Sequence, residues 1–223
     1  MKVIVFDTET TGLPQHPSGQ KMKSFLENQV KFWPHIIQFS YIIYDVGEHK
    51  LISAHDDILC VPSEIDINEE AFKLHGISKE KSLREGKDYK EVLEAFMLNL
   101  VNVDLVIGHN VAFDLNMLKA ELVRLHCSEH LTTLKHLQMN SKFYCTQMKT
   151  TKYCNIKSTS ADGREFVKWP KLSELHKVIF DEIPPLHKLH NSLIDCVICL
   201  RCYVHLEHKH DVYKNQDIVS IVI

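Results

Sequence analysis

The first thirteen residues, MKVIVFDTETTGL, constrain the fold more than any other stretch of the chain. Val3 to Phe6 form an apolar, β-branched run that is typical of a buried strand, and the polarity changes abruptly at Asp7. Because the side chains of a strand alternate between its two faces, Asp7 and Glu9 project to the same side. Turn-forming residues follow directly in the stretch TTGLP. The sequence therefore predicts a strand with a pair of carboxylates at its carboxyl end.

A carboxylate pair at this place favours a metal site. α/β sheets usually keep their sites at the carboxyl ends of their strands. Two carboxylates held at a fixed separation need a counter-charge, and hard divalent cations with oxygen ligands are the usual one. The plainer interpretation, a strand that simply ends in solvent, stays open on this stretch alone.

The rest of the chain predicts a sheet with helices packed on it. A long loop with a short helix at 24–30 is expected over residues 15–32, and neither it nor the tail has an assigned role. A hairpin antiparallel to the first strand comes next, and then strands and helices alternate. The expected ranges are strands at 35–45, 50–61, 103–107 and 142–146, helices at 88–100 and 114–125, a hairpin tip at Asp162-Gly163, a helix with Pro170 at its first position, and a last helix at 191–206. We expect one α/β domain over residues 1–205 and a C-terminal tail over 206–223.

The composition sets broad limits. At 223 residues and 44% hydrophobic content the chain can bury a substantial core. Seven cysteines, an odd number, and the absence of an apolar leader before the first strand predict an intracellular protein with reduced thiols. No apolar run approaches the roughly 20 residues that cross a bilayer, so no membrane association is expected.

Charge is informative only locally. The net charge of -3 does not by itself indicate a nucleic-acid binder. Residues 135–177, however, carry nine basic and three acidic side chains, a net +6 that leaves -9 for the remainder. Such a segment suits a phosphate backbone, and Lys168 and Lys171 are the strongest candidates because they flank a Trp-Pro turn.

Two more acids and a histidine are expected near the first pair. Asp114 follows GHNVAF at the start of a helix, and if the strand before it lies beside the first strand, Asp114 reaches Asp7 and Glu9. Asp195 lies in an apolar helix, where a free carboxylate is costly unless a cation or hydrogen-bond donor meets it. His190 precedes that helix and can lie over the site as a general base. An ordinary first-turn acid and a structural histidine are the alternatives.

Three stretches resemble a known family. DTETTGL, GHNVAFDLNML and HNSLID are similar to the three motifs of the DnaQ-like 3′–5′ exonucleases of the DEDD superfamily, which have a ribonuclease H-like fold. The resemblance implies a mixed sheet of about five strands. It also implies the DEDDh branch, because the position that is Tyr in the sister branch is Asn191. The implied metal-binding acids are Asp7, Glu9, Asp114 and Asp195, and the implied general base is His190.

The resemblance extends over roughly residues 1–205. LHGIS and KWPKLSEL are also similar to stretches common in the family. It implies that a set of residues contacts the terminal nucleotides: Thr10, Leu13, His75, Asn110 and Phe113.

The activity implied is a metal-dependent release of nucleoside monophosphates from DNA 3′ ends. Two Mg²⁺ ions, for which Mn²⁺ can substitute, would activate water and stabilise the leaving 3′-oxygen. The implied partner is nucleic acid with a free 3′ end, single-stranded DNA first, and a polymerase or a second copy is also compatible. The alternatives are an RNA 3′ exoribonuclease and a non-catalytic nucleic-acid-binding or polymerase-associated module. The complete set of acids with His190 argues against the last.

Overall fold

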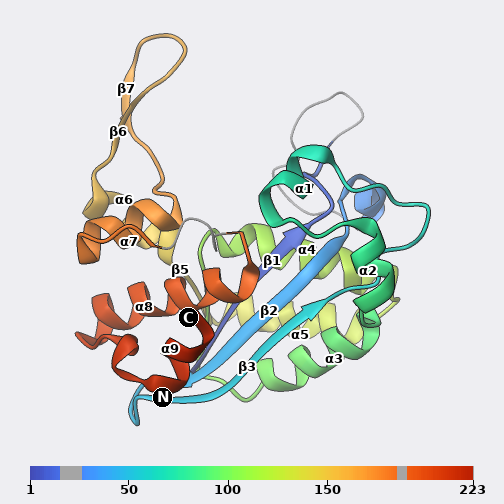
Figure 1. The fold of residues 1–223 in the computed structure, drawn as a ribbon, viewed down its shortest axis with the longest axis horizontal. Helices are drawn as coiled ribbons and strands as arrows, with labels where there is room; N and C mark the ends of the chain where they lie inside the picture. The colour runs from blue at the N-terminus through green and yellow to red at the C-terminus, as the bar shows by residue number, and fades with distance from the viewer. Residues whose placement is uncertain (16–26, 185–189, 223) are drawn as a thin grey trace.

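The computed structural model describes residues 1–15, 27–184 and 190–222, and its centre is a five-stranded mixed sheet (Figure 1). The strands lie in the order β3-β2-β1-β4-β5. β1 pairs antiparallel with β2 and parallel with β4, which confirms the predicted α/β class and its ribonuclease H-like form. The strand bounds are β1 Lys2–Thr10, β2 Ile36–Asp45, β3 Lys50–Ile58, β4 Leu105–Gly108 and β5 Phe143–Cys145.

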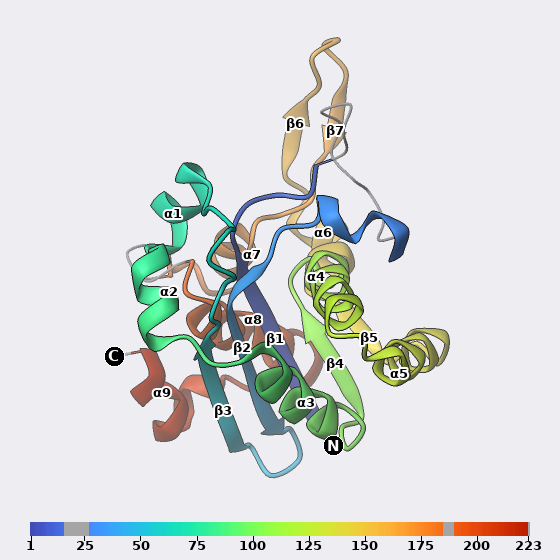
Figure 2. The ribbon, with the colours of Figure 1, turned by 90° about the vertical axis from the view of Figure 1, so that its right-hand side faces the viewer.

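Helices cover both faces of this sheet (Figures 1 and 2). The α-helices are α1 Glu69–His75, α2 Lys79–Glu85, α3 Tyr89–Leu100, α4 Val111–Arg124, α5 Ser128–Met139, α6 Thr146–Cys154, α7 Leu172–Phe180, α8 Ser192–His208 and α9 Gln216–Val222, and the 3₁₀ helices are η1 Glu27–Phe32 and η3 Val212–Lys214. Among the described helices none has both the length and the apolar character needed to cross a membrane.

The alternation of side chains along β1 decides which helix each residue meets. Ile4 and Phe6 pack in the core formed with α3 and α4. Val3 and Val5 pack in the other core, formed with α8. Since the period is two, the odd positions after Val5 continue toward α8 and the even ones toward α4. The central strand therefore delivers side chains to both helices at its carboxyl end.

A two-stranded hairpin stands apart from the main sheet. β6 Lys157–Thr159 and β7 Glu165–Val167 pair antiparallel between α6 and α7, and the hairpin projects from the body of the molecule (Figure 1). The Asp162-Gly163 pair lies at its tip as predicted, with Gly163 in the left-handed region at φ 81°.

The sequence predicted none of α1, α2, α5, α6 and α9, and several predicted boundaries differ from the observed ones. Pro170 precedes the α7 N-cap Lys171, because the Glu174 carboxylate accepts a hydrogen bond from the Lys171 amide and fixes the start of the helix there. The expected tail begins inside α8, and its residues Val212 and Ile218 are fully buried in the core around α8. Of the expected loop at 15–32, residues 27–32 form η1, and 16–26, including the start of the expected short helix, lie outside the described residues.

Candidate active site

Asp7 and Glu9 lie near the carboxyl end of β1, on the face of the sheet that α8 covers. Both are partly buried, and Glu9 pairs across the strands with Gln38 of β2. Burial raises the pKa of Asp7 well above its usual value, and the charges of Asp114, Asp195 and Glu9 raise it further. Burial and the charges of Asp195 and Asp114 raise the pKa of Glu9 to about 9. The pair is therefore held close to two further carboxylates.

Asp114 reaches this place from the first turn of α4. Its carboxylate Oδ1 accepts hydrogen bonds from the Thr8 hydroxyl at 2.8 Å and from the Thr8 amide at 3.1 Å. Asp114 is 3% exposed, and burial raises its pKa to about 7 although the Thr8 hydrogen bonds act in the opposite direction. Thr8, an even position of β1, thus fastens the third acid to the strand that carries the first two.

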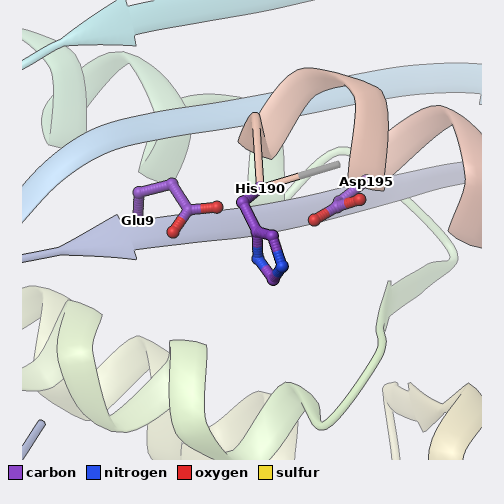
Figure 3. A group of neighbouring side chains, drawn as sticks. All are labelled: Glu9, His190 and Asp195. Atoms are coloured by element: carbon purple, nitrogen blue, oxygen red, sulfur yellow. The ribbon is translucent and has the colours of Figure 1, made fainter. Parts of the chain in front are cut away.

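Asp195 and His190 come from the start of α8. The Asn191 side chain caps this helix by accepting a hydrogen bond from the Ile194 amide at 3.2 Å, and His190 lies just before the cap with a left-handed φ of 64°. One ligand atom each of Glu9, His190 and Asp195 lies within 4.8 Å of the others, and the His190 ring lies between the two carboxylates (Figure 3). The structure therefore brings all five sequence-predicted residues to one edge of the sheet.

The acids fit a bound cation. Oxygen Oδ1 of Asp195 is buried and has no hydrogen-bond partner among the described residues. Burial also raises the pKa of Asp195 to about 7. The pKa values of all four carboxylates are raised, which indicates that within residues 1–15, 27–184 and 190–222 no nearby cationic side chain neutralises their charge. Hard oxygen ligands of this kind suit Mg²⁺ or Mn²⁺. These residues have the donor chemistry that a divalent-metal site requires.

A polar network that the sequence analysis missed holds the start of α8 against β2. The Ser40 hydroxyl donates to Asp56 at 2.7 Å, so the Ser192 hydroxyl donates to Ser40 Oγ at 2.5 Å. Gln38 donates to Asp56 at 2.7 Å and accepts from the Ser192 amide at 3.3 Å. The polar Gln38 and Ser40 interrupt an otherwise apolar strand, which is the signal that could have identified them.

A cavity of about 240 Å³ adjoins Glu9. Four of the five residues expected to contact nucleotides line it, namely Thr10, Leu13, His75 and Phe113. Asn110 is not part of this lining and is the α4 N-cap residue, exposed and at a left-handed φ of 67°. The Nδ1 atom of His75 accepts from the Ile77 amide at 3.0 Å, and burial lowers the His75 pKa, so the neutral ring carries its proton on Nε2.

A second histidine connects the site to the β6–β7 hairpin. His109 lies at the β4–α4 turn, and burial lowers its pKa to about 4, so the ring is neutral. Its Nε2 lies 3.0 Å from the Pro170 carbonyl, which can only accept, so Nε2 carries the proton. Its Nδ1 then accepts from the Thr146 hydroxyl at 2.9 Å. His109 therefore fastens the base of the hairpin beside the helix that carries Asp114.

Comparison with known proteins identifies the family. The RNase T family model, described as an exonuclease, matches residues 4–203. No curated protein sequence gives a significant match. Escherichia coli Exonuclease I in complex with a dA16 oligonucleotide matches with a TM-score of 0.58 at 16% identity, over 100% of this chain and 45% of that chain.

Two further solved structures are similar. A full-length 3′-exonuclease matches with a TM-score of 0.58 at 11% identity, over 93% of this chain and 60% of that one. A 3′-exonuclease that recognises the 3′ end of a histone mRNA stem-loop matches with a TM-score of 0.55 at 10% identity, over 94% of this chain and 83% of that one. The chain spans about half the length of Exonuclease I, and at these identities the likeness shows the fold. Because the family model covers most of the sequence, the chain belongs to the RNase T family of exonucleases, which are DnaQ-like 3′–5′ exonucleases of the DEDD superfamily.

Proposed function

We propose that this chain removes nucleoside monophosphates one at a time from the 3′ end of single-stranded DNA. The observation that supports this most is the convergence of Asp7, Glu9, Asp114 and Asp195 with His190 at the carboxyl end of β1. Such a set joins a cation-binding cluster to a proton acceptor. Both are needed for hydrolysis of a phosphodiester at neutral pH.

The four acids hold the divalent ions in this proposal. Two bound ions would supply Lewis-acid stabilisation of the attacking and leaving oxygens. The protein fixes the ligands in place, because Thr8 holds Asp114, and the network of Gln38, Ser40 and Ser192 holds the helix that carries Asp195. Rigid ligands of this kind need no reorganisation at the moment of reaction.

His190 takes the proton of the attacking water. Partial burial and the nearby charge of Lys171 lower its pKa, so the ring is neutral at pH 7 and a ring nitrogen can accept a proton. The ring lies between Glu9 and Asp195, next to the proposed ion ligands (Figure 3). After protonation the imidazolium is flanked by carboxylates, which stabilises it.

The cavity beside Glu9 receives the 3′-terminal nucleotide in this proposal. Leu13 and Phe113 provide apolar contacts for the base, and Thr10 and His75 provide polar ones. Asn110 contacts the strand from outside the cavity, at the amino end of α4.

An RNA 3′ exoribonuclease is the second candidate. The structurally similar 3′-exonuclease described above recognises the 3′ end of a histone mRNA stem-loop, and the acids would cleave either polymer. We also propose that the partner is a polymerase or a second copy of this chain. An intracellular location is proposed as well.

The deciding experiment compares end-labelled single-stranded DNA and RNA of the same sequence, with Mg²⁺, with Mn²⁺ and with EDTA. We expect stepwise shortening from the 3′ end of DNA, faster than of RNA, and none in EDTA. Undiminished turnover in EDTA would remove the metal mechanism, and faster shortening of RNA would make the second candidate the function.

A further inference from the structure

Exposed aromatic side chains lie in the β6–β7 hairpin and in the chain on either side of it. Trp169 is 64% exposed, Tyr153 57% and Phe166 46%, although aromatic side chains usually lie inside a fold. The six strand residues are exposed or half-buried, so the hairpin has no core of its own. A two-stranded hairpin by itself is only marginally stable in water, and exposed apolar surface often marks a binding site. We therefore expect this surface to bind a partner.

The basic residues around the hairpin differ in whether their charge is already neutralised. Arg164 donates to Asp162 at 2.7 Å through Nε, and Lys168 donates to Glu174 at 2.5 Å. In the described parts of the chain no ion pair is formed by Lys152, Lys157 or Lys171. Glu174 also accepts from the Lys171 amide, so it occupies the amino end of α7. Lys168 is therefore paired with Glu174, whereas Lys152, Lys157 and Lys171 form no ion pair with the residues that the structure describes.

This surface lies on the same side of the molecule as the active-site edge (Figures 1 and 2). The hairpin and the carboxyl end of β1 point to the same side of the molecule in both views (Figures 1 and 2). The hydrogen bond from His109 to the Pro170 carbonyl holds Trp169 and Lys171 beside α4.

We propose that the base of the hairpin, with Trp169 and Lys171, binds the unpaired DNA strand upstream of the 3′-terminal nucleotide, with Trp169 stacking on a base and Lys171 contacting a phosphate. The proposal deepens the proposed function and rests on it for the identity of the strand. Exposed aromatic rings interleaved with lysines are the surface that single strands use without sequence preference.

The first measurement is affinity for a labelled oligodeoxynucleotide of about 12 residues, a length within the usual range of single-strand sites. Fluorescence anisotropy in EDTA needs no hydrolysis, so it tests the inference even when the nuclease proposal fails. We expect Trp169→Ala to weaken binding roughly 5- to 100-fold, the range for one base–aromatic stack. Lys171→Gln should reduce the slope of log affinity against log salt by about 0.7, the value for one phosphate.

Matched controls come from surfaces far from the hairpin. Leu98→Ala removes an exposed apolar side chain on α3, and Lys214→Gln removes an exposed lysine in η3. Both should bind as the wild type does. If Trp169→Ala and Lys171→Gln bind as these controls do, the inference is wrong. If Trp169→Ala and Lys171→Gln lose affinity only for RNA of the same sequence, the bound strand is not DNA.

Intrinsic fluorescence provides a test that does not depend on a weakened variant. The chain has two tryptophans, and Trp33 is only 4% exposed. Stacking on a base should quench Trp169 and protect it from acrylamide. Trp169→Phe keeps an aromatic ring, so it should bind within about 3-fold of the wild type while losing this fluorescence change. Unchanged wild-type fluorescence at saturating oligonucleotide would overturn the stacking.

Hydrolysis then separates the two proposals. The wild type should prefer the long strand over a dinucleotide, and Trp169→Ala should lose most of that preference. A wild type that hydrolyses neither substrate but binds through Trp169 contradicts only the proposed function. A wild type that hydrolyses both, with the preference kept in Trp169→Ala, contradicts only the inference.

Discussion

The carboxyl end of β1 and the β6–β7 hairpin lie on the same side of the molecule but are stabilised in opposite ways. At β1 the acids are buried or half-buried, and their raised pKa values reflect burial first and the repulsion between the carboxylates second. The hairpin has no core, and its base is held by the hydrogen bond from His109 to Pro170.

This difference separates the residues proposed to carry out the reaction from the residues proposed to bind the strand. A reacting centre needs fixed groups, and fixing like charges close together costs stability that the apolar cores offset. A surface that follows a strand of any sequence needs accessible rings and charges instead. Changes at the acid edge should therefore alter turnover and stability, and changes at the hairpin should alter affinity.

The largest effect is expected from Asp7→Asn. Losing this ligand should lower turnover by about 10⁴-fold or more, because Lewis-acid stabilisation is worth several kcal/mol and each 1.4 kcal/mol is tenfold in rate. Oligonucleotide affinity in EDTA should not fall. The control is Asp217→Asn in the first turn of α9, an exposed acid away from the sheet edge. Near-normal turnover of Asp7→Asn on a 3′-labelled strand would contradict the role of Asp7 as a metal ligand and the contrast between the two regions.

His190→Ala should lower turnover by about 10²- to 10⁴-fold, the contribution of a general base. The stabilisation of the fold by Mn²⁺ should persist, since the acids remain. Because the pKa of His190 is lowered, wild-type activity should fall on the acid side of an ordinary histidine titration, and His190→Ala should lack that limb. A wild-type profile that shows no loss of activity on the acid side, or the same acid limb in His190→Ala, contradicts the assignment.

The stability of the metal-free protein should fall as pH rises. Asp114 and Asp195 have folded pKa values of about 7, above those of the unfolded chain, so the folded state binds more protons and loses that stabilisation as pH rises through 7. Asp195→Asn should raise the unfolding free energy in EDTA at pH 8 by about 1 to 3 kcal/mol. Thermal unfolding against pH checks this, and Mn²⁺ should remove the pH dependence. A metal-free wild type that grows more stable between pH 5 and 8 is the opposite result.

The smallest effect is expected from Ser192→Ala. Removing the hydroxyl that donates to Ser40 should cost about 0.5 to 1.5 kcal/mol of unfolding free energy, measured by urea titration. Turnover should fall a few-fold while oligonucleotide affinity stays constant, since the network positions α8 and not the hairpin. Ser63→Ala, at an exposed loop position, is the control. A change in affinity without a change in turnover would contradict the separation.

The strands and the helices α3, α4, α7 and α8 were predictable because their patterns are local, whereas α1, α2, α5, α6 and α9 were not predicted. Apolar periodicity located α3, β4, α4 and α8 to within a few residues, and the Asp162-Gly163 pair located the hairpin tip. The start of α7 and the packing of the tail were not predictable. The first depends on the Glu174 side chain reaching back to Lys171, and the second on Val212 and Ile218 meeting a core that only the folded sheet creates.

The sequence by itself identified the candidate residues, because the resemblance of DTETTGL, GHNVAFDLNML and HNSLID to the motifs of the family implies the four acids and His190. Only the tertiary structure decided how they are held: Thr8 reaches Asp114 and Ser40 reaches Ser192 across more than a hundred residues of chain. It also decided that Lys168 pairs with Glu174, whereas Lys171 forms no ion pair within the described parts of the chain. The physical reason is that hydrogen bonds and ion pairs depend on distances between side chains in space, which a linear pattern does not contain.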